Sequence, residues 1–173
     1  MYQNGQKQAT DAKLPLRILF VCHGNICRSP MAEYVLKHLV HQHKQDEYFV
    51  IDSAATSCEE IGNGVHPGTR RVLAEHNIAC GDHRARRLRP QDGASWDLIV
   101  AMDDANMRNI AKILPSQSQA SVHKLMLFTG NNTDVADPWY TGDFTTTYND
   151  IYAGCKALLA LLQPFLPQRS ASN

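Results

Sequence analysis

The sequence predicts a single α/β domain built on a four-stranded parallel sheet with helices on both faces. The chain has 173 residues, a length that one domain with a substantial core can accommodate. Apolar runs typical of strands alternate along it with segments of helical periodicity. Because no internal repeat or second domain is visible, this alternation favours parallel strands joined by right-handed crossovers.

The elements can be placed in order along the chain. Strands are expected at four apolar runs, 16–21, 48–54, 97–102 and 122–128. Helices are expected after them, from about Ser29 and over 68–78, 104–114 and 144–166. Ser29 followed by Pro30 is a favourable helix start, with Ser29 as the N-cap. A long loop over 129–143 precedes the last helix.

Composition and the two termini limit the class of protein. We expect a polar, poorly ordered extension over 1–14, a domain over 15–167 and a tail over 168–173. The N-terminus lacks the apolar core of a secretory signal, and no apolar run approaches the ~20 residues of a membrane-spanning helix. Lys and Arg number 17, as do Asp and Glu, so no net charge favours nucleic acid or an acidic membrane. Five cysteines without an export signal favour a reducing cytoplasm.

The most informative segment is VCHGNICRSP, which joins the first strand to the first helix. In a parallel sheet, ligands bind where strands end, and a helix start there offers unpaired N–H groups and a positive dipole. Gly24 and Asn25 tolerate the backbone angles that turn N–H groups inward. Arg28 adds a planar fork that matches two phosphate oxygens. The segment therefore predicts a phosphate-binding loop after the first strand.

Cys22 lies at the base of this loop, where its neighbours favour the thiolate. A thiolate that faces a bound phosphate is a nucleophile, so phosphoryl transfer onto sulfur is predicted. The Gly-Lys-Ser/Thr of a nucleotide-binding loop is missing. Release of the leaving group needs a proton donor. Asp137 is the best candidate, because Pro138 stiffens the chain beside it while Trp139 and Tyr140 offer an apolar wall.

These motifs resemble the low-molecular-weight protein tyrosine phosphatases. The resemblance rests on VCHGNICRSPMAE, DSAATSCEEIGN, AMDDAN and DPWYTGDF, and it runs from about residue 16 to residue 162. It implies two-step hydrolysis of phosphotyrosine in protein substrates, without metal or other cofactor, by a monomer or weak homodimer. Cys22 would be the nucleophile that forms a cysteinyl-phosphate, Arg28 the phosphate clamp, and Asp137 the general acid and base.

The same resemblance implies supporting roles. Ser29 would donate a hydrogen bond to the thiolate, and Asn25 would be held in a left-handed conformation by a polar network whose other members are Ser29, Ser53 and His83. Cys27 resembles a second loop cysteine that protects the nucleophile by forming a disulfide with it. The remaining substrate-binding positions would be His23, Gly24 and Ile26 in the loop, and Glu59, Trp139 and Tyr140 at the rim.

One residue departs from the family pattern. Glu59 stands where these enzymes usually have Trp or Tyr at the rim of the active site. We expect this change to weaken the handling of small aryl phosphates, and a preference for a basic residue beside the tyrosine is an alternative outcome.

Other functions remain as alternatives. Arginine phosphatases share the fold but tend to have Thr where this chain has Ile26. A thiol-dependent arsenate reductase would need further relay cysteines, and Cys80 has no close companion. A cysteine phosphocarrier would not need Asp137, and an inactive phosphotyrosine-binding module would be expected to lack Cys22 or Asp137.

Overall fold

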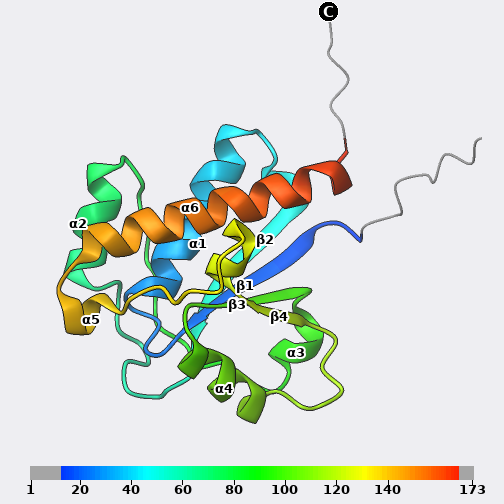
Figure 1. Ribbon diagram of the computed structural model, residues 1–173, viewed down its shortest axis with the longest axis horizontal. Helices are drawn as coiled ribbons and strands as arrows, with labels where there is room; N and C mark the ends of the chain where they lie inside the picture. The colour runs from blue at the N-terminus through cyan, green and yellow to red at the C-terminus, as the bar shows by residue number, and fades with distance from the viewer. Residues whose placement is uncertain (1–12, 168–173) are drawn as a thin grey trace, which may run out of the picture.

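The computed structural model describes residues 13–167 and contains one sheet, seen in Figure 1. Its strands are β1 (Leu16–Cys22), β2 (Phe49–Ala55), β3 (Leu98–Ala101) and β4 (Ser121–Lys124). All neighbouring strands are parallel, in the order β2-β1-β3-β4. The predicted four-stranded parallel sheet is confirmed. Of the expected termini, residues 1–12 and 168–173 lie outside the described residues, and Leu14 packs against the core.

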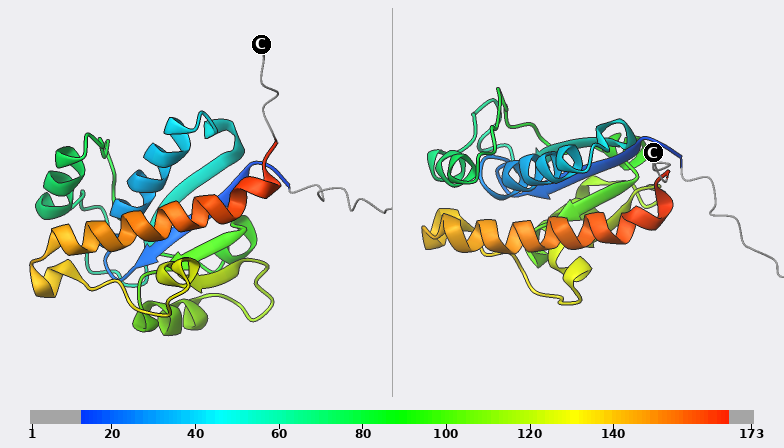
Figure 2. Two further views of the ribbon diagram at one scale, coloured as in Figure 1. Left: turned by 45° about the horizontal axis from the view of Figure 1, so that its top comes forward. Right: turned by 90° about the horizontal axis from the view of Figure 1, so that it is seen from above.

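Helices cover both faces of this sheet. The α-helices are α1 (Arg28–Gln42), α2 (Pro67–Glu75), α3 (Asp92–Ser95), α4 (Asp104–Ile113), α5 (Pro138–Thr141) and α6 (Phe144–Leu162). The 3-10 helices are η1 (Asp46–Tyr48), η2 (Leu125–Thr129) and η3 (Gln163–Phe165). α1, α2 and α6 contribute to the core on one face, and α4 packs on the other, as Figure 2 shows. Within residues 13–167, no helix is long and apolar enough to cross a membrane.

β1 lies in the middle of the sheet, and its side chains alternate between the two faces. Ile18 and Phe20 join the core beneath α1 and α6, whereas Leu19 and Val21 join the smaller core beneath α4. All four side chains are fully buried. Burial on both faces explains why the first strand is a continuous apolar run. It also fixes Cys22, the last residue of β1, at the C-terminal edge of the sheet.

The fourth strand is shorter than predicted. β4 ends at Lys124, and residues 125–129 form η2 instead of continuing the strand. Leu125 and Met126 are both buried in the same core, and consecutive residues of a strand would point to opposite faces. α6 approaches so closely that a Cβ on Gly154 would lie 2.5 Å from Cγ of Leu125. The tight turn therefore packs two successive apolar side chains under α6.

Several helix boundaries also differ from the prediction, and α2 ends at Glu75 and not at residue 78. α1 begins at Arg28 with Cys27 as its N-cap, so Ser29 lies inside the first turn and is not the cap. α6 ends at Leu162 and not at residue 166, because Pro164 has no N–H to continue the helical hydrogen bonds. The loop predicted over 129–143 contains α5, which Asp137 caps at its N-terminus.

Candidate active site

The loop between β1 and α1 is a cradle of unpaired backbone donors. In the described part of the chain, the N–H groups of residues 23–27 have no acceptor. The loop carbonyls point outward instead: those of His23 and Ile26 accept from Ser57 N and His66 N at 3.0 and 2.8 Å. Asn25 has a φ of +58°, the left-handed conformation expected for it. Together with the start of α1, these donors form a site for an anion.

Cys22 lies at the base of this cradle and is 3% exposed. Its Sγ is 3.0 Å from Oγ of Ser29. Ser29 Oγ accepts from Nδ2 of Asn25 at 2.9 Å, so its own hydrogen is free to point at the sulfur. The carbonyl of Ala54, at 3.4 Å, is a more distant alternative acceptor. The hydroxyl that the sequence suggested as a helix cap is thus placed to stabilise a thiolate.

A buried network holds Asn25 in place. Its Nδ2 also donates to Oγ of Ser53 at 2.9 Å, and its Oδ1 accepts from the backbone N–H of Arg86 at 3.0 Å. The ring of His83 bonds the Asn25 carbonyl at 2.8 Å. Ser53 Oγ in turn donates to Oε2 of Glu33 at 2.6 Å. The structure therefore brings together the three partners expected from the sequence and adds Glu33, which sequence reasoning missed.

Arg28 crosses the floor of the site with its side chain 3% exposed. Its Nη1 donates to Oδ2 of Asp103 at 2.6 Å and to the carbonyl of Val135 at 3.0 Å, and its Nη2 donates to Oδ2 of Asp137 at 3.1 Å. A guanidinium has five N–H donors. The Nε–H and one Nη2–H have no acceptor within residues 13–167, and both lie on the edge that suits bidentate binding of a phosphate.

The charges around Arg28 keep it protonated. Burial by itself would lower the pKa of Arg28, but the negative charges of Cys22, Asp137 and Asp103 and the hydrogen bond to Asp103 raise it. The guanidinium is therefore a permanent cation next to the sulfur.

Asp103 is a second residue that sequence reasoning missed. It follows β3 and caps α4, with Oδ1 accepting from the N–H of Asn106 at 2.7 Å. The other oxygen is thereby directed at Arg28. The signal was present in the sequence, because an Asp at the end of a parallel strand lies on the same sheet edge as the loop after β1.

Asp137 is fixed beside Arg28 by the start of α5. Its Oδ1 accepts from the N–H of Trp139 at 3.1 Å while Oδ2 faces Arg28. The preceding chain is held at two points: the N–H of Val135 donates to the carbonyl of Met102, and the Thr147 hydroxyl donates to the carbonyl of Ala136. The long loop therefore brings the predicted proton donor to the same pocket as Cys22.

The pocket above Cys22 has a volume of about 100 Å³. The lining residues are Cys22, His23, Gly24, Ile26, Cys27, Arg28, Glu59, Glu60, Asp137, Trp139 and Tyr140. Every residue expected to bind substrate lines it, except Asn25 and Ser29, which lie behind the loop in the supporting network. Trp139 and Tyr140 are 57% and 83% exposed, as a rim for a substrate ring requires.

Cys27 lines the same pocket but differs from Cys22 in its surroundings. It is 5% exposed. Burial, followed by the negative charges of Cys22 and Asp137, raises the pKa of Cys27 to about 12. Cys27 is therefore a neutral thiol near pH 7, and Cys22 is the cysteine placed to act as the nucleophile.

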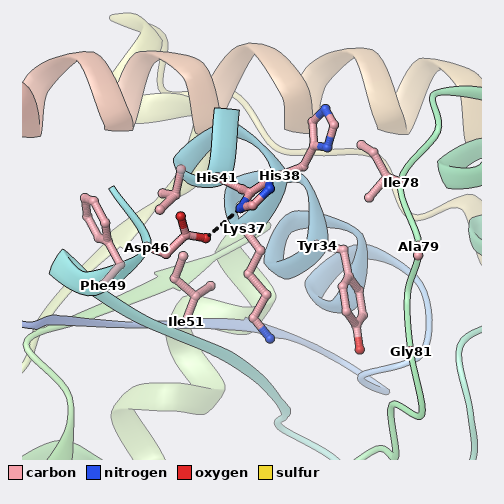
Figure 3. A pocket seen from close by; sticks show the side chains of 11 residues that line it. Tyr34, Lys37, His38, His41, Asp46, Phe49, Ile51, Ile78, Ala79 and Gly81 are labelled. Atoms are coloured by element: carbon pink, nitrogen blue, oxygen red, sulfur yellow. Dashed lines mark hydrogen bonds and ion pairs between the residues drawn. The ribbon is translucent and has the colours of Figure 1, made fainter. Parts of the chain in front are cut away.

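A larger cavity, of about 600 Å³, lies elsewhere, between α1, β2 and residues 78–81. Figure 3 shows Tyr34, Lys37 and the hydrogen-bonded His41–Asp46 pair, which is 3.1 Å apart, among its lining residues. Among the residues that the structure describes, neither a cysteine nor an arginine lines this cavity. The residues that the sequence predicts for the chemistry therefore line the smaller pocket above Cys22 and not this cavity.

A parallel α/β sheet whose first loop carries a cysteine and an arginine around a phosphate cradle defines a phosphatase class of protein. Residues 17–166 match the family model described as low molecular weight phosphotyrosine protein phosphatase. The chain belongs to this family and is therefore an enzyme, a hydrolase of phosphoric monoesters.

Individual relatives support the assignment. The chain is 35% identical over 150 residues to the low molecular weight protein-tyrosine-phosphatase YfkJ of Bacillus subtilis, covering 86% of this chain and 96% of YfkJ. It is 41% identical over 133 residues to the low molecular weight phosphotyrosine protein phosphatase of Schizosaccharomyces pombe. This match covers 73% of this chain and 83% of the relative. The two matches therefore extend over most of both relatives.

Solved structures show the same fold. The crystal structure of YfkJ has a TM-score of 0.84 at 33% identity and covers 90% of this chain and 98% of its own. A crystal structure of a Drosophila arginine phosphatase has a TM-score of 0.77 at 28% identity. The match covers 91% of this chain and 100% of the arginine phosphatase chain. The fold alone therefore does not separate tyrosine from arginine phosphatases.

Proposed function

We propose that this enzyme hydrolyses phosphotyrosine in protein substrates through a cysteinyl-phosphate intermediate. The observation that carries the proposal is the position of Cys22 beneath five unpaired N–H groups and beside the free edge of Arg28. A phosphate dianion bound to these donors would present its phosphorus to Sγ of Cys22. Trp139 and Tyr140 supply exposed rings for the tyrosine side chain.

In the first step, the Cys22 thiolate attacks phosphorus while the bond from phosphorus to the tyrosine oxygen breaks. Asp137 gives its proton to that oxygen, so tyrosine leaves as a neutral phenol. The charge that develops on the equatorial oxygens is stabilised by the loop N–H groups and by Arg28.

In the second step, water attacks the phosphorus of the intermediate and the sulfur–phosphorus bond breaks. The Asp137 carboxylate accepts a proton from this water, and inorganic phosphate and the Cys22 thiolate are released. The hydroxyl of Ser29 stabilises the departing thiolate from 3.0 Å.

Three alternatives are less well supported. Only Cys22 and Cys27 line the pocket among the cysteines, so a third thiol for arsenate reduction lies elsewhere in the chain. A phosphocarrier would preserve its cysteinyl-phosphate, whereas Asp137 beside Arg28 favours its hydrolysis. Phosphoarginine is the strongest alternative substrate, because an arginine phosphatase shares the fold.

The proposal is tested by phosphate release from matched phosphotyrosine, phosphoarginine and phosphoserine peptides. We expect the phosphotyrosine peptide to have the highest kcat/KM. Cys22→Ser should abolish turnover but still bind vanadate or phosphate, because the cradle and Arg28 remain. Faster release from phosphoarginine would identify an arginine phosphatase, and turnover by Cys22→Ser would exclude Cys22 as the nucleophile.

A further inference from the structure

The mouth of the pocket carries a contact that the hydrolysis scheme does not use. Glu59 lines the pocket from the loop after β2, and its side chain is 71% exposed. Its Oε2 lies 3.0 Å from Nε2 of His23, a residue of the phosphate loop that is 48% exposed. This pair joins two loops that are 36 residues apart in the chain. The ring of His23, from the phosphate loop, is therefore held by the carboxylate of Glu59, from the loop on the other side of the pocket mouth.

The mouth is otherwise short of positive charge. Next to Glu59, Oε2 of Glu60 accepts a hydrogen bond from the neutral amide of Asn63 at 2.6 Å. Arg28 is at the base and already contacts Asp103 and Asp137. Among the residues that line this pocket, His23 and Arg28 are the two that can carry a positive charge. A phosphate dianion therefore passes an exposed carboxylate on its way to the cradle.

We propose that Glu59 selects phosphotyrosine sites that have an Arg or Lys within two residues of the phosphotyrosine. His23 occupies the Glu59 carboxylate while no substrate is bound, and the substrate's cation replaces it. This inference rests on the proposed function and names the substrate class that the same site prefers. Arg is the better fit, because Trp139 and Tyr140 are exposed at the same mouth and a guanidinium stacks on aromatic faces.

The size of the effect follows from exposure. An ion pair between exposed side chains changes an equilibrium constant by about 1.4- to 5-fold, and salt screens it. Replacing a flanking Arg by Glu exchanges attraction to Glu59 for repulsion. The kcat/KM of the Arg peptide should therefore exceed that of the Glu peptide by about 2- to 25-fold at low ionic strength. Because the flanking residue contacts Glu59 before and during the reaction, the change should fall on KM and not on kcat.

The test uses three phosphotyrosine peptides that differ at one flanking position, which carries Arg, Gln or Glu. We expect kcat/KM of the wild-type enzyme to fall in that order, and the Arg-to-Glu ratio to shrink as salt is added. In Glu59→Gln the ratio should fall toward one, and in Glu59→Lys the order should reverse. Reversal by a charge-inverted variant cannot arise from misfolding, which would lower all three rates together.

Two further variants separate Glu59 from its neighbours. Glu60→Gln is the matched control, since it removes an adjacent carboxylate that contacts Asn63, and it should keep most of the Arg preference. His23→Gln removes the internal competitor, so the Arg-to-Gln ratio should rise. If all three peptides are hydrolysed at equal kcat/KM by the wild type, this inference is wrong while the proposed function stands. If no phosphotyrosine peptide is hydrolysed, the proposed function itself fails.

Discussion

Nη1 of Arg28 lies 2.6 Å from Oδ2 of Asp103, a residue 75 positions further along the chain. Asp103 uses its other oxygen to cap α4, so the helix cap fixes the carboxylate that orients the guanidinium. Nη1 is held by Asp103 and by the carbonyl of Val135, and one Nη2–H is held by Asp137, so the Nε–H and the other Nη2–H are left to face the phosphate. Asp103 is therefore a positioning residue for the proposed clamp.

Asp103→Asn should lower kcat/KM for an aryl phosphate by roughly 10- to 100-fold, the equivalent of about 1.5–3 kcal/mol for a hydrogen bond to a charged group. The amide still caps α4, but it lacks the charge that holds Arg28. The affinity for vanadate should fall in parallel, because the free edge of Arg28 is no longer directed at the anion. Steady-state kinetics and vanadate titration check both expectations.

Asp104→Asn is the matched control for this prediction. Asp104 is the adjacent carboxylate, is 64% exposed and contacts Lys124 at 2.8 Å rather than Arg28. Its loss should leave the vanadate affinity near that of the wild type. Equal losses in both variants would mean that the support of α4 and β4 matters, and not the orientation of Arg28.

Asp137→Asn should lower kcat by roughly 10²–10⁴-fold on aryl phosphates with poor leaving groups, the usual range for a lost general acid. Asn retains the cap of α5 but cannot release a proton to the leaving oxygen. The loss should shrink as the leaving group becomes more acidic, because such a group departs without help. A series of substituted phenyl phosphates measures this slope, and a uniform loss across it would indicate a structural role for Asp137.

The parts of the fold and site that the sequence predicted are those set by local pattern. The continuous apolar run of β1 and the six residues that follow it are sufficient to place Cys22 and Arg28 at the sheet edge. Asp137 was found because it lies beside Pro138 and two aromatic residues, in a long loop that follows a predicted strand; Asp-Pro alone is a common turn signal. Each of these inferences depended on residues that are neighbours in the chain.

The parts that were missed depend on distant contacts. In the sequence, Glu33 is an ordinary polar residue of the first helix, and only the fold brings its carboxylate to Ser53 at 2.6 Å. Asp103 needs α4 to be capped before its second oxygen points at Arg28. The end of β4 was wrong for a similar reason, since Leu125 and Met126 turn under α6, which comes much later in the sequence.

Asn25 offers a test of why the phosphate loop keeps its shape. Asn25→Ala should destabilise the protein more than Asn25→Gly, by about 1 kcal/mol in the free energy of unfolding. Both variants lose the hydrogen bonds to Ser29 and Ser53, but only Ala also meets the steric cost of a φ near +58°. Urea unfolding of the two variants measures the difference. Equal stability would mean that the side-chain network alone determines the loop.

Oxidation of the two cysteines in the phosphate loop should depend on pH. Peroxide should convert the Cys22 thiolate to a sulfenic acid, and the Cys27 thiolate should then attack that sulfur, release hydroxide and close a disulfide. In the reduced enzyme, burial is the largest cause that raises the pKa of Cys27 to about 12. This burial remains after Cys22 is oxidised, so the Cys27 thiolate is scarce near neutral pH and its fraction rises with pH. Disulfide formation should therefore be slow at pH 6 and faster at pH 8.5.

Slow closure leaves the sulfenic acid open to further, irreversible oxidation. We therefore expect the activity recovered by thiol after a fixed peroxide pulse to increase between pH 6 and pH 8.5, and mass spectrometry to find the Cys22–Cys27 link mainly at the higher pH. Cys27→Ser should recover poorly at every pH. Cys58→Ser, which removes an exposed thiol outside the pocket, should behave like the wild type. Full recovery at pH 6, or in Cys27→Ser, would show that Cys27 does not protect the nucleophile.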